Sequence, residues 1–324
     1  MNRTRNIAVI GAGLAGLSAA TALTAAQQTV TLFERSTQPG GRLGINADTD
    51  LGAQYFTVRH AAFHQATRDW QAHKWIAEWS PRVFYYTQEH GLQPSTDDTL
   101  RQVGTPGMQA LARHLADVCQ TLSLDISHLQ PTAAGQWLLL DAENAAHGPF
   151  DQVVIATTPD AATPLLEAAP QLQHAVSQVR MLPCWSLAAR FAGPLPTPVD
   201  ACFVRTGALD WIARNNSKPE RGSDEVWTLQ STADWAQAHA SNDPAQVTAE
   251  LLTALGNVLD LPELSPAATY AHFWAAAKPA EALEWGALAA PELGIYVCGD
   301  WCLGGRIENA WLSGLQAAQA LLEK

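Results

Sequence analysis

The amino-acid sequence predicts an α/β protein in which a parallel-sheet domain is interrupted by a second, α+β domain. Three observations support this prediction. An apolar run at 7–10, a glycine-rich turn, an alanine-rich run at 14–25 and a second apolar run at 29–33 follow the order strand, turn, helix, strand, which builds parallel sheets. Between about 180 and 285 the chain changes to frequent prolines and short strand-like segments. From 294 onward it returns to strand, turn and helix.

Length and composition limit the classes of protein that fit. The chain of 324 residues is long enough for two domains, and 47% hydrophobic with 15% charged residues is typical of a compact globular protein. A net charge of -12 without a Lys/Arg-rich stretch argues against general affinity for nucleic acid. Five cysteines without CxxC spacing fit a reducing compartment. No apolar run approaches the ~18 residues of a membrane span, so we expect a soluble, cytoplasmic protein.

The first glycine-rich turn has the spacing of a Rossmann-type dinucleotide site. Gly11 allows the tight turn, Gly13 lets the backbone approach a pyrophosphate, and Gly16 lets the helix pack close to the strand. The start of the helix presents free N–H groups and a partial positive charge to the phosphates. Glu34 ends the second strand, where its carboxylate can accept hydrogen bonds from ribose hydroxyls. A 2′-phosphate would be repelled there, which argues against bound NADP.

Two later motifs favour FAD over NAD as the bound nucleotide. Gly40-Gly41-Arg42 supplies a second close-approach turn and a guanidinium for the pyrophosphate. Asp300, after the last strand, can accept a hydrogen bond from a ribityl hydroxyl. The final helix would begin at the pyrimidine edge of the flavin, where negative charge accumulates on reduction. Alone, this tail is equally well explained as an ordinary strand-to-helix turn. Together with the first turn it predicts non-covalently bound FAD and no metal.

The remaining elements follow from the same patterns. The predicted helices cover 60–79, 108–122, 244–259 and the tail to about Leu322, and the further predicted strands cover 137–141, 152–157, 186–191, 202–205, 225–230 and 294–298. The predicted FAD-binding domain comprises residues 1–60, 101–165 and 288–324, and the predicted substrate (cap) domain comprises 61–100 and 166–287.

Several motifs together resemble the amine-oxidase-related flavoprotein superfamily. They are GAGLAG, FER, GGR, DLGAQYFT at 50–57, ATTP at 156–159 and YVCGDWCLGGRIENAWLSG at 296–314. Three middle segments bring the sequence closest to the bacterial renalases, namely GTPGM at 104–108, DWIARNNSKP at 210–219 and EWGAL at 284–288. The resemblance runs the whole chain and implies an amine-oxidase-like architecture.

The resemblance also implies roles for individual residues. The ADP half of FAD would be held by Gly11, Ala12, Gly13, Leu14, Ala15, Gly16, Glu34, Arg35, Gly41 and Arg42. The isoalloxazine would be lined by Gly52, Ala53, Gln54, Tyr55 and Phe56, with Asp300, Arg306, Glu308 and Trp311 near its ribityl and pyrimidine parts. The implied reaction passes a hydride from 2- or 6-dihydro isomers of NAD(P)H to flavin N5 and then to O2, giving β-NAD(P)+ and hydrogen peroxide.

No second glycine-rich dinucleotide unit appears between 50 and 290, so the reductant should enter a pocket formed with the cap. The candidate substrate-binding residues are Tyr55, Phe56, Trp185, Trp211, Asn215, His272, Trp274, Lys278 and Trp301. Each tryptophan on its own is better explained as a core residue, and His272 as a structural residue rather than a partner of a nicotinamide carboxamide. Arg214, Asn215 and Lys218 would meet a phosphate or amide, or form a solvated loop.

Two other functions stay open at this point. An amine oxidase would want an aromatic cage and a lysine near flavin N5, for which Lys278 is the candidate by location. A flavin-binding sensor without turnover is the third hypothesis. No nucleophile–base pair stands out, which fits a hydride transfer that works by positioning. His60 and His64 lack an acidic companion, and Cys298 and Cys302 are four residues apart across a strand end. We expect no metal or redox site at either pair.

Overall fold

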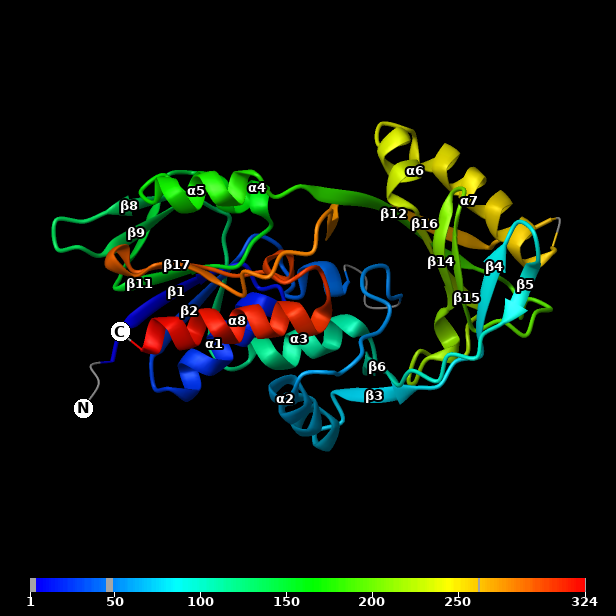
Figure 1. The fold of residues 1–324 in the computed structure, drawn as a ribbon, viewed down its shortest axis with the longest axis horizontal. Helices are drawn as coiled ribbons and strands as arrows, with labels where there is room; N and C mark the ends of the chain where they lie inside the picture. The colour runs from blue at the N-terminus through cyan, green and yellow to red at the C-terminus, as the bar shows by residue number, and fades with distance from the viewer. Residues whose placement is uncertain (1–3, 45–48, 262, 324) are drawn as a thin grey trace.

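A computed structural model describes residues 4–44, 49–261 and 263–323. Two sheets dominate it, a six-stranded sheet at one end of an elongated molecule and a seven-stranded sheet at the other (Figure 1). Helices and strands are mixed in both halves, so the α/β prediction is confirmed. None of the helices in the described ranges combines the length and apolar character needed to cross a bilayer.

The six-stranded sheet is parallel apart from one edge strand. Its order is β17 (Leu288–Ala290), β18 (Ile295–Val297), β11 (Gln152–Ile155), β1 (Asn6–Ile10), β2 (Thr29–Glu34) and β7 (Gln120–Ser123). The edge strand β17 runs antiparallel to β18. Every residue of β11 is buried, as expected for a parallel strand covered on both faces.

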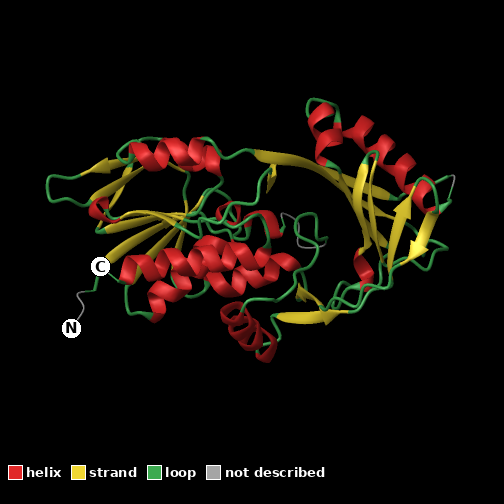
Figure 2. Cartoon of the chain, viewed as in Figure 1, coloured by secondary structure: helices red, strands yellow, loops and turns green. Residues whose placement is uncertain are grey.

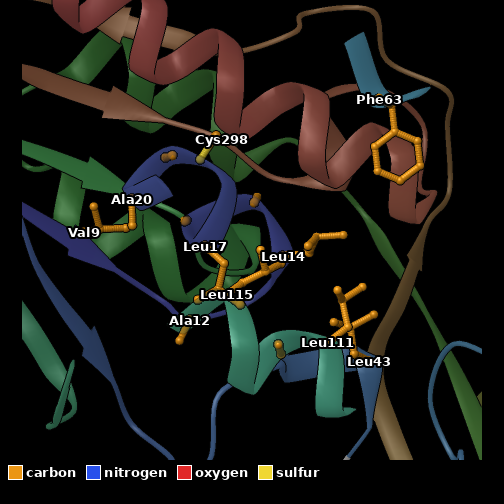
Figure 3. Close-up of a cluster of buried hydrophobic side chains, with 14 of the residues drawn as sticks. Val9, Ala12, Leu14, Leu17, Ala20, Leu43, Phe63, Leu111, Leu115 and Cys298 are labelled. Carbon is orange, nitrogen blue, oxygen red and sulfur yellow. The ribbon is translucent and has the colours of Figure 1, made fainter. Parts of the chain in front are cut away.

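Helices cover one face of this sheet. They are α1 (Leu14–Ala25), α3 (Met108–Ala116) and α8 (Ile307–Leu322), with α2 (Ala61–Ala72) beside α8 (Figure 1). Leu17, Leu111 and Leu115 lie in the cluster between them (Figure 3). The helices α1 and α8 approach so closely that a Cβ on Gly314 would lie 2.0 Å from the carbonyl oxygen of Ala15. Glycine at this position therefore permits the contact.

The opposite face carries a three-stranded sheet and short helices. The elements are β8 (Ile126–Pro131), β9 (Trp137–Asp141), β10 (Ala146–Phe150), α4 (Pro159–Ala162) and α5 (Pro170–Ser177) (Figure 2). Their apolar side chains form a second core with Ile10, Phe33 and Val153 of the sheet.

The seven-stranded sheet is mostly antiparallel. Its order is β16 (Ala268–Pro279), β12 (Met181–Arg190), β15 (Val226–Ser231), β14 (Leu209–Arg214), β13 (Ala201–Thr206), β4 (Val83–Thr87) and β5 (Gly91–Pro94). The helices α6 (Ala233–Ala238) and α7 (Pro244–Leu259) pack on one face and bury a third core. On the other face, Ala201, Trp211 and Ala213 join the core that also contains α1 and α3.

Two predicted helices are too long. The predicted helix at 60–79 ends at Ala72, and Ile76–Trp79 instead forms β3, which pairs with β6 (Arg101–Gly104). Lys74 has a φ of 61°, a left-handed conformation that ends the helix. The predicted helix at 108–122 ends at Ala116, because Gln120–Ser123 pairs with β2 as the edge strand β7. Strand pairing therefore overrode the local pattern at both places, whereas the helices at 14–25 and 244–259 are confirmed.

Candidate functional site

The turn between β1 and α1 separates structural glycines from a glycine that borders open space. A Cβ on Gly16 would lie 1.9 Å from the carbonyl oxygen of Gly11, and one on Gly11 would lie 2.7 Å from that of Ala156. Gly13 differs, because a Cβ there would meet nothing within 4 Å. The backbone at Gly13 therefore borders room for a ligand, at the N-terminus of a 12-residue helix.

The second glycine turn packs directly against the first. The Gly40 N–H donates to the Ala12 carbonyl over 2.9 Å, and a Cβ on Gly41 would lie 3.7 Å from Gly13 Cα. Gly41 has a φ of 51°, which favours glycine. The Glu34 carboxylate accepts a 2.8 Å hydrogen bond from the Ala12 N–H, so it lies beside the same turn. Two turns and one carboxylate thus surround the space expected for the ADP half of a dinucleotide.

The tail motif joins this group through an ion pair. Arg42 bonds the Asp300 carboxylate through both of its terminal nitrogens, one of them over 2.9 Å, and also the Ala277 carbonyl over 3.1 Å. Asp300 begins the short 3-10 helix η5 (Asp300–Cys302) that follows β18. The structure therefore brings together the front and tail motifs that the sequence predicts to share one nucleotide. Arg35 is exposed beyond the end of β2.

The start of α8 carries a buried carboxylate. Glu308 is buried, and its carboxylate oxygen Oε1 accepts hydrogen bonds of 2.7 Å from the N–H groups of both Arg59 and His60. This carboxylate holds the loop that leads into α2, and its expected place beside the flavin stays a prediction. Arg306 is exposed at the N-cap of α8, and Trp311 packs 5.5 Å from the Phe63 ring.

A buried charge cluster lies under the segment expected to line the isoalloxazine. One oxygen of Asp50 is 3.0 Å from Lys218 Nζ and 2.8 Å from a terminal nitrogen of Arg221. All three side chains are at most 4% exposed. Burial raises the pKa of Asp50, but the two cations outweigh it and hold that pKa below its usual value. Burial also lowers the pKa of Lys218, against the pull of Asp50. The alternative of a solvated loop at Lys218 is wrong.

This charge cluster fixes the orientation of Gln54. Lys218 Nζ donates to Gln54 Oε1 over 3.1 Å, and Gln54 Nε2 donates to the Gly52 carbonyl over 3.1 Å. Gln230 of β15 donates to the same carbonyl over 2.7 Å. A Cβ on Gly52 would lie 2.1 Å from the Arg42 carbonyl oxygen. The segment is therefore tied to both the glycine turns and the seven-stranded sheet.

An inner cavity of about 230 Å³ opens where this segment meets the sheet. Its lining residues are Gln54, Tyr55, Phe203, Arg205, Asp210, Trp211 and Gln230. Among the described residues, the lining includes no histidine, lysine or cysteine. The Tyr55 ring lies 5.5 Å from Trp211, and the Arg101 guanidinium lies 5.1 Å from the Tyr55 ring centre. Trp211 Nε1 is a buried donor without a hydrogen-bond partner in the described chain.

The wall of the inner cavity belongs to one row of residues across the seven-stranded sheet. We call it the cross-strand row, and its members in sheet order are His272, Ser186, Gln230, Trp211, Phe203 and Tyr85. Because residues directly opposite one another in a sheet face the same side, these six side chains share the face away from α6 and α7. His272 and Trp274 meet at 4.3 Å on this face, and burial lowers the pKa of His272, which favours its neutral form.

Three predicted substrate contacts lie elsewhere. Trp185 faces the core under α6 and α7, where its Nε1 donates to the His239 carbonyl over 3.1 Å. It neighbours Ser186 of the cross-strand row, and successive strand residues face opposite sides. Trp301 is fully buried and donates to the Thr157 carbonyl over 3.0 Å. Phe56 packs against Phe63 at 5.8 Å, within the first core. These residues are corrected to core positions.

The other candidates show mixed outcomes. Tyr55 and Trp211, which the sequence predicts to contact the substrate, border the inner cavity. Asn215 is instead buried against the backbone of Asp50. Lys278 is 52% exposed and lies 3.5 Å from Asp210. Sequence reasoning missed Arg221, Gln230 and Arg205. Gly207 follows the strand-like segment CFVR at 202–205 and indicates a turn, which places Arg205 at the end of a strand. No local pattern indicates that Asp50 and Arg221 are partners.

The two residue pairs considered for metal or redox chemistry have ordinary roles. His60 Nδ1 accepts a hydrogen bond from the Ala62 N–H and so caps α2. Cys298 and Cys302 are free and buried, and burial raises the pKa of Cys302 to about 12. A neutral buried thiol is a poor nucleophile and a poor ligand.

Comparison with known proteins places this site in a family. Residues 75–322 match the family model of flavin-containing amine oxidoreductases, and residues 9–83 match an NAD(P)-binding Rossmann-like domain. A putative protoporphyrinogen oxidase from Exiguobacterium sp. 255-15 is 13% identical over 100% of both chains, with a TM-score of 0.77. Cyclohexylamine oxidase from Brevibacterium oxydans IH-35A is 12% identical over 99% of both chains, with a TM-score of 0.76.

These comparisons confirm the predicted Rossmann-type and amine-oxidase-like architecture. The open space at Gly13, the facing turn at Gly41 and the adjacent pair of Arg42 and Asp300 fit the flavin that the family name specifies, and the predicted cofactor FAD is confirmed. The chain therefore belongs to the family of flavin-containing amine oxidoreductases, and it is an FAD-dependent oxidoreductase.

Proposed function

We propose that this protein is a renalase-type oxidase. It would take a hydride from the 2- or 6-dihydro isomers of NADH or NADPH and pass the electrons to O2, giving β-NAD(P)+ and hydrogen peroxide. The observation that carries this proposal is the wall of the inner cavity, which combines the flat rings of Tyr55 and Trp211 with the amides of Gln54 and Gln230. Residues 1–60, 101–165 and 288–324 would bind FAD, and 61–100 with 166–287 would cover the substrate.

The chemistry demands little of the protein besides positioning. When bound, FAD supplies a hydride acceptor at N5. Loss of a hydride from a misreduced nicotinamide restores an aromatic ring, so no side chain has to remove a proton from the substrate. A site that works by orientation needs flat walls and fixed hydrogen-bonding groups. The inner cavity offers both, because Lys218 and Gln230 restrain the segment that carries Gln54 and Tyr55.

The unpaired indole of Trp211 supports an amide-bearing ligand. A buried N–H without a partner is rare and costs about 1–3 kcal/mol. Trp211 Nε1 is such a donor, and its ring borders the inner cavity. A nicotinamide carboxamide oxygen accepting from it would recover this cost. His272 and Trp274 lie farther along the same face of the sheet, where they would close the slot rather than contact the carboxamide.

Amine oxidation is the second candidate, and its support is the family itself together with the aromatic wall at Tyr55 and Trp211. The lysine expected for that chemistry is not placed for it. Lys278 is half-exposed beside Asp210, and Lys218 is buried against Asp50. Among the described residues that line the inner cavity, none is a lysine.

Anaerobic mixing of the FAD-loaded protein with single donors tests the proposal. We expect 2- or 6-dihydro-NAD to bleach the flavin absorbance rapidly, and to be released as β-NAD+. Ordinary amines should leave the absorbance unchanged. Bleaching by amines alone would replace the proposal with amine oxidation. If neither class of donor bleaches the flavin, the protein acts as a flavin-binding sensor and both oxidase functions are rejected.

A further inference from the structure

A second cavity shares two lining residues with the inner cavity. This outer cavity measures about 460 Å³, and both cavities are lined by Phe203 and Arg205. The inner cavity alone, at about 230 Å³, is smaller than the roughly 300–1,000 Å³ typical of small-molecule sites. The two together fall within that range. A ligand larger than one ring system would therefore extend from the inner cavity past Phe203.

An accessible aromatic surface follows the cross-strand row into the outer cavity. Tyr85 of β4 lies opposite Phe203 of β13, and their rings stack with centroids 5.2 Å apart and planes 19° apart. Tyr85 is 39% exposed, unlike the buried Trp211 on the other side of Phe203. The aromatic wall thus changes from buried to accessible along its length. An exposed ring of this kind can stack on a planar base.

A bulge aims a guanidinium at the same place. The pairing of β13 with β14 shifts register between Phe203 and Thr206, and Arg205 in this interval has a φ of 51°. A left-handed arginine is strained, and bulges commonly redirect a side chain. The Arg205 guanidinium lies 4.7 Å from the Phe203 ring centre. The irregular backbone at Arg205 therefore places a cation over the aromatic wall.

The charges around the two cavities leave Arg205 available. Asp210 lies 3.5 Å from Lys278, and Glu89 lies 3.8 Å from His90. Arg205 forms no ion pair with any residue that the structure describes. The protein carries a net charge of -12, which repels anions at long range. An anionic ligand at this surface would need a local cation, and Arg205 is in position to supply it.

We infer that the outer cavity is a subsite for the adenosine phosphate half of a dinucleotide substrate. The Arg205 guanidinium binds the phosphate, for which its planar fork is suited, and the adenine stacks on the open face of Tyr85. This inference rests on the proposed function, because the nicotinamide half occupies the inner cavity beside Tyr55 and Trp211. The subsite would distinguish dinucleotides from shorter dihydronicotinamides, because Arg205 and Tyr85 would contact the adenosine phosphate and not the reacting ring.

Calorimetry with ADP-ribose tests the subsite without turnover. The FAD-loaded enzyme is used, so that the cofactor site is already filled. Arg205→Ala should weaken ADP-ribose binding about tenfold, and Tyr85→Ala should weaken it several-fold. Tyr85→Phe keeps the ring and should bind normally. In steady-state assays, Arg205→Ala should raise the KM for 6-dihydro-NAD by a similar factor. Tyr85 lines the outer cavity and not the inner one, so Tyr85→Ala should leave the KM for the matching dihydronicotinamide mononucleotide, which lacks the adenosine phosphate, within about twofold of wild type.

Two further variants separate binding from folding and from net charge. Arg205→Gly relieves the positive φ and should unfold no more easily than wild type while binding ADP-ribose weakly. Arg190→Ala removes an exposed arginine that pairs with Asp224 in the same sheet, and it should bind normally. Equal ADP-ribose affinity in wild type and Arg205→Ala, or no binding to wild type, overturns the subsite. Failure of the proposed function shows separately, as a flavin that neither the dinucleotide nor the mononucleotide bleaches.

Discussion

The three glycines of the first turn, Gly11, Gly13 and Gly16, have different roles. At Gly16 and Gly11 an added Cβ would collide with backbone oxygen atoms, 1.9 Å and 2.7 Å away. At Gly13 an added Cβ would meet no protein atom within 4 Å. The backbone at Gly13 is extended, with φ of -69° and ψ of 171°, which alanine also adopts. The requirement for glycine at this position therefore comes from the ligand and not from the fold.

Gly13→Ala should separate FAD binding from stability. We expect the cofactor-free protein to unfold at the same denaturant concentration as wild type or slightly higher, since alanine restricts the unfolded chain by about 0.4–1 kcal/mol. FAD affinity, measured by fluorescence titration, should fall at least about tenfold. Gly193→Ala, where a Cβ also meets nothing within 4 Å, is the matched control and should bind FAD normally. Normal FAD binding by Gly13→Ala would show that the pyrophosphate lies elsewhere.

Single residues also mark where sequence reasoning stopped. Tyr55 and Trp211, two of the predicted substrate contacts, line the inner cavity, whereas Trp185 lies in the core under α6 and α7. In a strand, which face a tryptophan occupies depends on register, and a shift of one residue reverses it. Both faces of the seven-stranded sheet are covered, so Met181–Arg190 shows no polar alternation that would reveal its inner side. Composition alone could not assign Trp185 to the core beneath α6 and α7.

At the scale of elements, the pair β3 and β6 supports the wall of the inner cavity. Arg101 of β6 is buried under the Tyr55 ring and forms an ion pair with Asp97. Hydrogen bonds from the side chain and N–H of Thr99, together with Arg101, lower the pKa of Asp97 to about 2. The loop before β6 thus holds the arginine on which Tyr55 rests.

This pair predicts a pH dependence of stability. Because the folded-state pKa of Asp97 lies below its unfolded value, its contribution is complete above about pH 4 and is lost as the pH falls toward 2. Asp97→Asn should lower the free energy of unfolding at pH 7 by about 2 kcal/mol. The difference from wild type should shrink as the pH is lowered through that window in urea titrations. Asp98→Asn removes the same charge from an exposed neighbour and should change stability little. A deficit for Asp97→Asn that is constant with pH would contradict the assignment.

The predicted boundaries agree best with the structure for helices whose residues form the element without pairing to a distant segment. The boundaries of α1 and α7 agree with the sequence. The helix α1 is an alanine- and leucine-rich run that follows the glycine turn, and α7 begins with Pro244 after the capping residue Asp243. The segments after α2 and α3 failed because β3 and β7 are strands through pairing with distant residues, respectively Arg101–Gly104 and Thr31–Glu34. Strand propensity depends strongly on such context.

At the scale of the whole molecule, the buried charge cluster joins distant parts of the chain. Asp50 lies beside the segment predicted to line the flavin, whereas Lys218 and Arg221 follow β14 of the seven-stranded sheet. One carboxylate facing two cations leaves a net charge of about +1 in a buried place. Asp50 and Lys218 are 168 residues apart, so no local pattern predicts their contact. The sequence shows that Asp50, Lys218 and Arg221 are charged, but it does not show that they pair with one another.

Substitutions in this cluster should follow its charge balance. Asp50→Asn leaves two buried cations without a carboxylate and should reduce stability by about 3–5 kcal/mol. Lys218→Met should cost less, because Arg221 still faces Asp50. The double variant Asp50→Asn/Lys218→Met should therefore be more stable than Asp50→Asn alone, as measured by denaturant unfolding of the FAD-loaded protein. Equal stability of the single and double variants would refute this view of the cluster.

The order of strands in the six-stranded sheet has a consequence for biosynthesis. The strand β18 pairs with β11, and α8 packs against α1, yet both β18 and α8 follow the whole seven-stranded sheet in the chain (Figure 1). During translation, α1 leaves the ribosome early but lacks its partner α8 until Ile307–Leu322 has been added. Asp300 arrives at the same late moment. Because Asp300 pairs with Arg42 beside the glycine turns, the complete nucleotide site can form only after the seven-stranded sheet has been synthesised.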